Sequence, residues 1–101
     1  MEKLERDGKV AVLYSPGYGA GWYTWGGDER MIFDPRIVQA VLDEDRKRAI
    51  EIVAEIDKNI YTGGAEDLAV QWIEKGTQFK INEYDGNESI EIIGPSSFFI
   101  A

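Results

Sequence analysis

The apolar residues of this chain change their period once, and that change restricts the fold class more than any other feature of the sequence. From Pro35 to Lys58 they recur at helical spacing, whereas from Leu68 onwards they alternate with polar residues, as in strands with one buried face. Helices in one part of a chain and antiparallel strands in another are typical of an α+β fold. The length of 101 residues suits a single domain, which we expect to span residues 1–101.

Two helices are expected in the first of these parts. Asp34-Pro35 is a helix-start signal, with aspartate as the N-cap and proline at the first helical position. The acidic residues 43–45 interrupt the apolar stripe and provide a cap for a second helix, from Arg46 to Lys58. One continuous bent helix is the alternative interpretation.

The strands are expected to form one sheet. The apolar run from Lys9 to Tyr14 predicts a buried strand after a loosely held polar lead-in, residues 1–8. The later segment divides at Lys75-Gly76 and at Asp85-Gly86, a strong hairpin signal, and ends at Gly94-Pro95. We therefore predict a three-stranded meander that the first strand joins, giving a three- to four-stranded, mostly antiparallel sheet packed by two helices.

A segment rich in glycine and aromatic residues, residues 15–27, follows the first strand directly, and a brief strand is expected within it at Trp22–Trp25. Glycine lets a backbone approach a ligand closely, and aromatic rings stack on planar groups. We expect a pocket in which backbone N–H groups of the glycines face a ligand and the rings stack on it. The residues expected to line it are Gly17, Tyr18, Gly19, Gly21, Trp22 and Trp25, with Tyr23 as a further stacking candidate. The alternative is a structural turn whose aromatic residues complete the core.

Known phosphate-binding patterns do not fit this loop. The dinucleotide fingerprint requires a third glycine where this chain has Trp22, and the phosphate-loop lysine is missing, although a looser backbone nest for an anion stays open. A second candidate site comprises Gly63 and Gly64 with the acids Glu66 and Asp67. Paired glycines before a strand admit a ligand or another backbone, and the acids would receive a ribose hydroxyl or an amine. The alternative there is a helix stop followed by a polar turn.

The chain contains no histidine and no cysteine, which removes the commonest general base and the nucleophilic thiol. We therefore expect no enzyme, no catalytic residues, no cofactor and no metal site. Three acids surround the hairpin signal, Glu83, Asp85 and Glu88, and we expect them to be solvated turn carboxylates.

The formal net charge is −8, and residues 61–101 contribute seven acids against two bases. This balance argues against direct binding of nucleic acid, and it permits a basic protein partner or simply supports solubility. The apolar tail Phe98-Phe99-Ile100 would anchor an interface or a homo-oligomer, or pack on its own core. No apolar run approaches the roughly 20 residues that span a bilayer, so we expect no membrane partner.

Two blocks of the sequence, VLYSPGYGAGWYTW and GGAEDLAVQWIEKGTQFKINEYDGNESIE, resemble a family of small uncharacterised phage- and prophage-associated bacterial proteins. The resemblance covers Val10 to Trp25 and Gly63 to Glu91. It implies a mobile-element setting, a location in the host cytoplasm and an anti-defence role. Two functions follow as expectations. The first is sequestration of a small nucleotide-like ligand by the glycine and aromatic loop, and the second is an acidic module that blocks a host nucleic-acid-binding protein.

Overall fold

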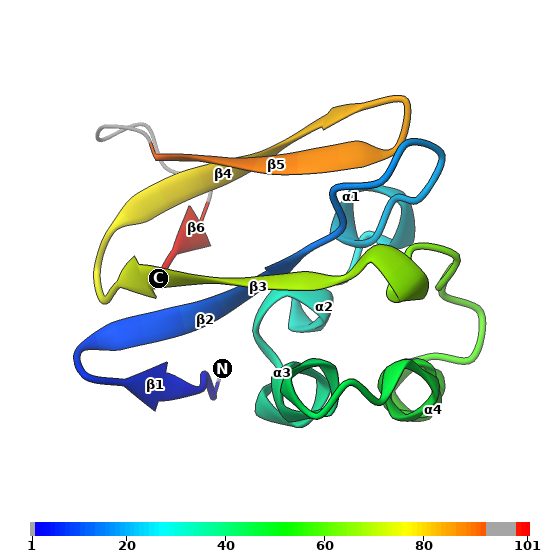
Figure 1. Cartoon of the computed structure of the whole chain (residues 1–101), viewed down its shortest axis with the longest axis horizontal. Helices are drawn as coiled ribbons and strands as arrows, with labels where there is room; N and C mark the ends of the chain where they lie inside the picture. The colour runs from blue at the N-terminus through cyan, green and yellow to red at the C-terminus, as the bar shows by residue number, and fades with distance from the viewer. Residues whose placement is uncertain (1, 93–98) are drawn as a thin grey trace.

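The computed structural model of this chain describes residues 2–92 and 99–101, and it confirms the predicted α+β class (Figure 1). The predicted strand end at Gly94-Pro95 lies outside the described residues. The helices and strands, in chain order, are β1 (Glu5–Arg6), β2 (Lys9–Tyr14), α1 (Tyr23–Gly26), α2 (Arg30–Phe33), α3 (Pro35–Leu42), α4 (Arg46–Ile56), a 3-10 turn (Ala65–Asp67), β3 (Ala69–Glu74), β4 (Gln78–Tyr84), β5 (Asn87–Ile92) and β6 (Phe99–Ile100).

The strands form two antiparallel three-stranded sheets, with orders β1-β2-β3 and β5-β4-β6. The predicted single meander is therefore wrong, because β3 pairs with β2 and β4 begins the second sheet. The turn between β3 and β4 redirects the chain. Gly76 has a φ of 88°, and its N–H donates to the carbonyl of Ala101 at 2.7 Å, next to β6. Alternation within a strand encodes its buried face but not its partner.

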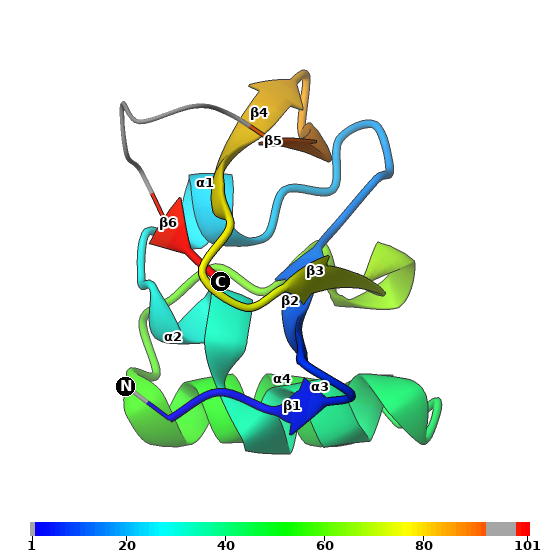
Figure 2. The ribbon, with the colours of Figure 1, turned by 90° about the vertical axis from the view of Figure 1, so that its left-hand side faces the viewer.

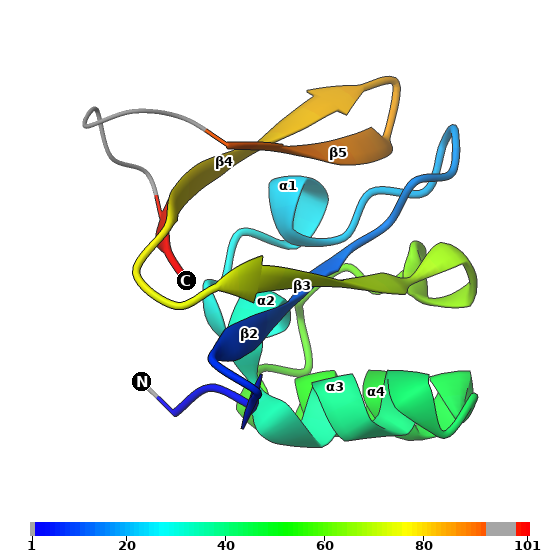
Figure 3. The ribbon, with the colours of Figure 1, turned by 60° about the vertical axis from the view of Figure 1, so that its left-hand side comes forward.

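The first sheet lies between the second sheet and the helices α3 and α4 (Figures 2 and 3), and residues 10–13 of its central strand, β2, are buried. Val10 and Val12 of β2 pack toward the second sheet, while Ala11 and Leu13 pack toward α3 and α4. A strand covered on both faces reads as a continuous apolar run. That is why residues 10–13 of β2 are uniformly apolar.

The two predicted helices are present as separate helices, which excludes the single bent helix. The Asp34 carboxylate caps α3 by accepting the N–H of Arg36 at 2.8 Å, and the Asp45 carboxylate caps α4 by accepting the N–H of Arg48 at 3.0 Å. α4 ends at Ile56, two residues before the predicted end. Among residues 2–92 and 99–101, none of the helices combines the length and the apolar character that crossing a membrane requires.

The N-terminal segment is more ordered than predicted. Residues Asp7 and Gly8, with φ of 52° and 77°, join β1 to β2 through the same turn that Asp85 and Gly86, with φ of 52° and 84°, make between β4 and β5. The predicted lead-in therefore contains an Asp-Gly hairpin of its own.

The C-terminal tail packs on its own chain. The Phe99 ring lies 5.5 Å from the Phe79 ring and 5.2 Å, edge to face, from the Tyr23 ring. Phe99 therefore completes the core between the two sheets, as the alternative interpretation expected, while Ile100 is half exposed. Phe98 lies outside the described residues.

Candidate functional site

The glycine-rich loop, residues 15–22, is closed against the β4–β5 hairpin. Gly19 donates its N–H to the carbonyl of Asp85 at 2.6 Å, and Gly21 donates to the carbonyl of Gly86 at 2.8 Å. In return the N–H of Glu88 donates to the carbonyl of Ser15 at 2.8 Å. Loop and hairpin turn thus form one unit at the end of β2 (Figure 1).

The side chain of Glu88 is the polar centre of this unit, and it is fully buried. Its Oε1 accepts the N–H of Ser15 at 2.8 Å, and its Oε2 accepts the N–H of Trp22 at 2.9 Å. Oε2 also accepts the N–H and the hydroxyl of Thr24, at 2.8 and 2.7 Å. The prediction that Glu88 is a solvated turn carboxylate is therefore wrong. The loop does form a backbone nest for an anion, and the chain's own carboxylate occupies it.

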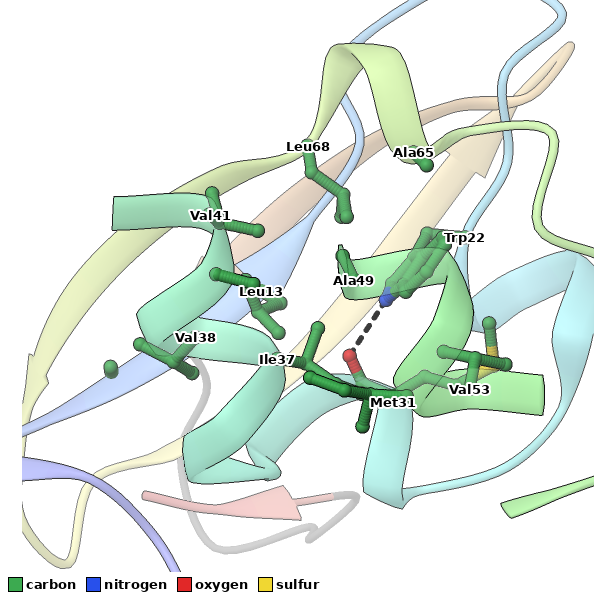
Figure 4. Close-up of a cluster of buried hydrophobic side chains, with 13 residues drawn as sticks. Leu13, Trp22, Met31, Ile37, Val38, Val41, Ala49, Val53, Ala65 and Leu68 are labelled. Atoms are coloured by element: carbon green, nitrogen blue, oxygen red, sulfur yellow. Dashed lines mark hydrogen bonds between the residues drawn. The ribbon is translucent and has the colours of Figure 1, made fainter. Parts of the chain in front are cut away.

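Trp22 belongs to the core rather than to a binding surface. Its side chain is fully buried, and its Nε1–H donates to the carbonyl of Met31 at 2.7 Å (Figure 4). It packs among Ile37, Val53 and other residues under the first sheet. The expectation that Trp22 stacks on a ligand is corrected accordingly, because neither face of the indole reaches solvent. The brief strand predicted around it is wrong as well, since a one-turn helix, α1, begins at Tyr23.

Two of the other predicted aromatic residues reach solvent. Tyr18 is 73% exposed and Trp25 is 43% exposed. The Trp25 ring covers Gly21 and lies 5.5 Å from the ring of Tyr61, a residue that the sequence analysis did not select. Gly17 lies against the side chain of Asp67.

The second candidate site lies beside the first. The carbonyl oxygen of Gly64 accepts a hydrogen bond from the Ser15 hydroxyl at 2.9 Å. A Cβ atom on Gly64 would collide with the carbonyl oxygen of Gly21. Glycine is needed here because another backbone approaches closely, and that backbone is the loop itself. Gly63 lies under the Tyr61 ring, and Glu66 is exposed.

These segments together present a surface that we call the aromatic–acidic end. Its exposed aromatic residues are Tyr18, Trp25, Tyr61 and Tyr84, and its exposed carboxylates are Glu66, Asp67, Glu83 and Asp85. The sequence contains no lysine or arginine in residues 10–29, 59–74 or 81–92. Tyr84 was also missed, and its position beside the Asp85-Gly86 turn was the available signal.

Three hollows among the described residues, of about 280 to 340 Å³ each, are lined by residues outside the loop. One adjoins Asp34 and Arg36, one lies between α3 and α4, and one adjoins Trp72. Within the described ranges no three histidine, cysteine or acidic side chains are grouped as metal ligands. The loop amides of Gly19 and Gly21 are bonded to the hairpin, and the rings of Tyr18 and Trp25 are exposed, so the loop end suits contact with another surface. Comparison with family models, curated proteins and solved structures gave no match for this chain.

Proposed function

We propose that this protein is a non-enzymatic binding module whose aromatic–acidic end blocks the basic surface of a nucleic-acid-binding protein. The observation that carries the proposal is the composition of that end. Four exposed aromatic rings stand among four exposed carboxylates, on segments that contain no basic residue. Tyrosine and tryptophan are enriched at protein interfaces, where they bury a large area at a low cost in side-chain entropy.

Sequestration of a nucleotide-like ligand by the loop, the other function expected from the sequence, has less support. Gly19 and Gly21 donate their N–H groups to hairpin carbonyls, and Glu88 occupies the anion nest. The indole of Trp22 is buried. A phosphate brought to this end would face carboxylates without a compensating cation, which is unfavourable.

Charge complementarity supports the choice of partner. An acidic surface built from segments without lysine or arginine accelerates encounter with a basic surface and discriminates against acidic ones. The basic surfaces that proteins use for nucleic acid have this complementary character. The resemblance to phage-associated proteins supports the same setting, the cytoplasm of a bacterial host.

The experiment compares capture from a bacterial lysate on the immobilised protein and on the variant Tyr18→Ser/Tyr84→Ser. Both side chains are about three-quarters exposed, so their removal leaves the core intact. We expect the unmodified protein to retain a basic nucleic-acid-binding protein at low salt and to release it as salt rises, because exposed charges are screened. The purified partner should then lose nucleic acid from a preformed complex when this protein is added.

The matched control is Ile50→Ser, which removes an apolar side chain of 38% exposure from α4. It should capture the partner as the unmodified protein does, while the double tyrosine variant should not. Equal capture by the double variant, or a partner that still binds nucleic acid in the presence of excess protein, would contradict the proposal.

A further inference from the structure

The outer edge of strand β5 is a free sheet edge. The second sheet has the order β5-β4-β6, so β5 pairs with a strand on one side only. β2 reaches β5 at the glycine-rich loop and runs away from it toward the other end of the molecule (Figures 1 and 3). Among residues 2–92 and 99–101, the one backbone hydrogen bond at this edge is donated by Glu88 to the carbonyl of Ser15. The rest of the edge has no partner strand in the described part of the chain.

The register of the β4–β5 hairpin determines which backbone groups face outward. In a hairpin with a two-residue turn, the residues that flank the turn, here Tyr84 and Asn87, exchange both hydrogen bonds, and alternate pairs beyond them do the same. The positions of β5 that bond to β4 are therefore Asn87, Ser89 and Glu91, and the outward positions are Glu88, Ile90 and Ile92. The bond from Glu88 to Ser15 agrees with this assignment. The N–H groups of Ile90 and Ile92 thus point away from the sheet.

The side chains at this edge are also uncovered. Ile92 is 55% exposed, although its cross-strand partner Phe79 is fully buried. Ile90, on the same face, is half-buried against the core between the sheets. Proteins commonly protect a sheet edge with lysine, proline or a bulge. β5 contains no lysine or proline, and its six residues pair with β4 without a bulge. It therefore lacks the usual protection against pairing with another strand.

The charge around the edge selects among the strands that could pair with it. Residues 81–92 contain four acids and no base, and β5 begins beside Tyr84 and Asp85 of the aromatic–acidic end. Glu91 is exposed, and its contact with Lys80 of β4, at 3.9 Å, is longer than a hydrogen bond. A second copy of this chain would bring the same acidic hairpin and a net charge of −8. A basic segment is attracted instead.

We infer that the outer edge of β5 binds an extended basic segment of the partner as an added antiparallel strand, the pairing that both sheets already use. Backbone hydrogen bonds to Ile90 and Ile92 would hold the segment, as in other cases of strand addition. Cross-strand partners share a face, so the segment would place apolar side chains beside these isoleucines and basic side chains beside Ser89 and Glu91. The inference rests on the proposed function and names the residue pattern that the site accepts.

The test uses the full chain and a seven-residue peptide, capped at both ends, in which valine and lysine alternate. We expect the peptide to shift the amide signals of Ile90 and Ile92 and to slow their hydrogen exchange. In an antiparallel pair, the residue opposite Ile90 shares its face and its hydrogen bonds, so the valine N–H groups would bond to β5. N-methylation of the valines should therefore abolish binding, whereas N-methylation of the lysines should weaken it only a few-fold.

Two matched variants of the protein test the same edge. Ile92→Lys places a cation where the basic segment would lie and should weaken peptide binding about tenfold or more. Ile100→Lys adds the same charge at 50% exposure on β6, the opposite edge of the sheet, and should weaken binding less than about twofold because exposed charges are screened. Ile92→Lys should also retain less partner from the lysate than Ile100→Lys does.

The inference and the proposed function fail separately. Normal capture by Ile92→Lys, with no amide shifts at millimolar peptide, would overturn strand addition and leave the proposed function standing. Equal capture by the double tyrosine variant would contradict the proposed function while the peptide shifts remain. Equal binding of the two methylated peptides, or equal weakening by Ile100→Lys, would also overturn the inference. So would slowed exchange of Ile90 and Ile92 that rises with the concentration of the protein alone, since a second copy would then occupy the edge.

Discussion

The two ends of β2 carry the same kinds of residue and use them in opposite ways. After Tyr14, at one end, the Trp22 indole is buried and donates to the carbonyl of Met31, and a buried carboxylate, Glu88, accepts the backbone N–H groups of Ser15 and Trp22. Before Lys9, at the other end, a half-buried indole and two cations border an open hollow. The glycine-rich end of β2 is closed by hydrogen bonds to the β4–β5 hairpin, whereas the end before Lys9 borders a hollow that is open to solvent.

The difference shows what glycine and aromatic content can predict. Such a segment indicates that something approaches its backbone closely, and the structure identifies the approaching group as another part of the same chain.

The largest expected effect tests whether the closed end is part of the core. Trp22→Ala should lower the free energy of unfolding by about 3–5 kcal/mol, because it leaves a cavity and removes a buried hydrogen bond. Trp25→Ala, its neighbour at 43% exposure, is the control and should cost much less. Urea unfolding measures both, and equal losses would mean that the two indoles are equivalent.

The next effect concerns the carboxylate that closes the loop. Glu88→Ala should cost about 3 kcal/mol, because N–H groups of Ser15, Trp22 and Thr24 lose their acceptor where water is excluded. Glu91→Ala, on the exposed side of the same strand, is the control and should have little effect. Hydrogen exchange of the loop amides should accelerate in Glu88→Ala alone. Unchanged protection in that variant would show that the Glu88 carboxylate does not hold the loop in place.

Two glycines permit a direct comparison of the ends. Gly86 and Gly8 have similar positive φ and follow aspartate in equivalent turns. A Cβ on Gly86 would lie 2.8 Å from the nitrogen of Ala20, whereas one on Gly8 would meet nothing within 4 Å. We expect Gly8→Ala to cost about 1 kcal/mol from backbone strain alone and Gly86→Ala about 2 kcal/mol or more. Thermal unfolding of the pair measures the difference, which would vanish if the loop did not touch the hairpin.

The smallest expected effect concerns Asp28, a partly exposed carboxylate that is paired with a cation, whereas Glu88 is buried and accepts backbone N–H groups. The hydrogen bond from Arg30 holds the pKa of Asp28 below its ordinary value of 3.8. A lowered pKa contributes stability above the unfolded value, and that contribution is lost as pH falls below about 4. Because the Arg30 side chain is half exposed and the Asp28 side chain partly exposed, solvent screens the pair and the loss should be slight. Carbon-detected titration should show the Asp28 pKa rising in Arg30→Gln; an unchanged pKa would contradict the assignment.

The sequence predicted the local structures whose signals lie within a few residues. The caps at Asp34 and Asp45, the turn at Asp85-Gly86 and the strand β2 are examples, and Asp7-Gly8 would have revealed β1 by the same rule. It did not predict which strands pair, because alternation in β3 and β4 is the same in one sheet or two. The burial of Glu88 could not be predicted from the sequence either, because the N–H groups that it accepts lie 64 to 73 positions earlier in the chain.

The separation between Ser15 and Glu88 has a consequence for biosynthesis. As the chain leaves the ribosome, β2 and the helices α3 and α4 emerge well before the β4–β5 hairpin, which carries Glu88. Contacts between such distant positions form late and slowly. Throughout that interval the glycine-rich segment has no acceptor for its amides except water, so we expect it to be accessible to proteases in the nascent chain.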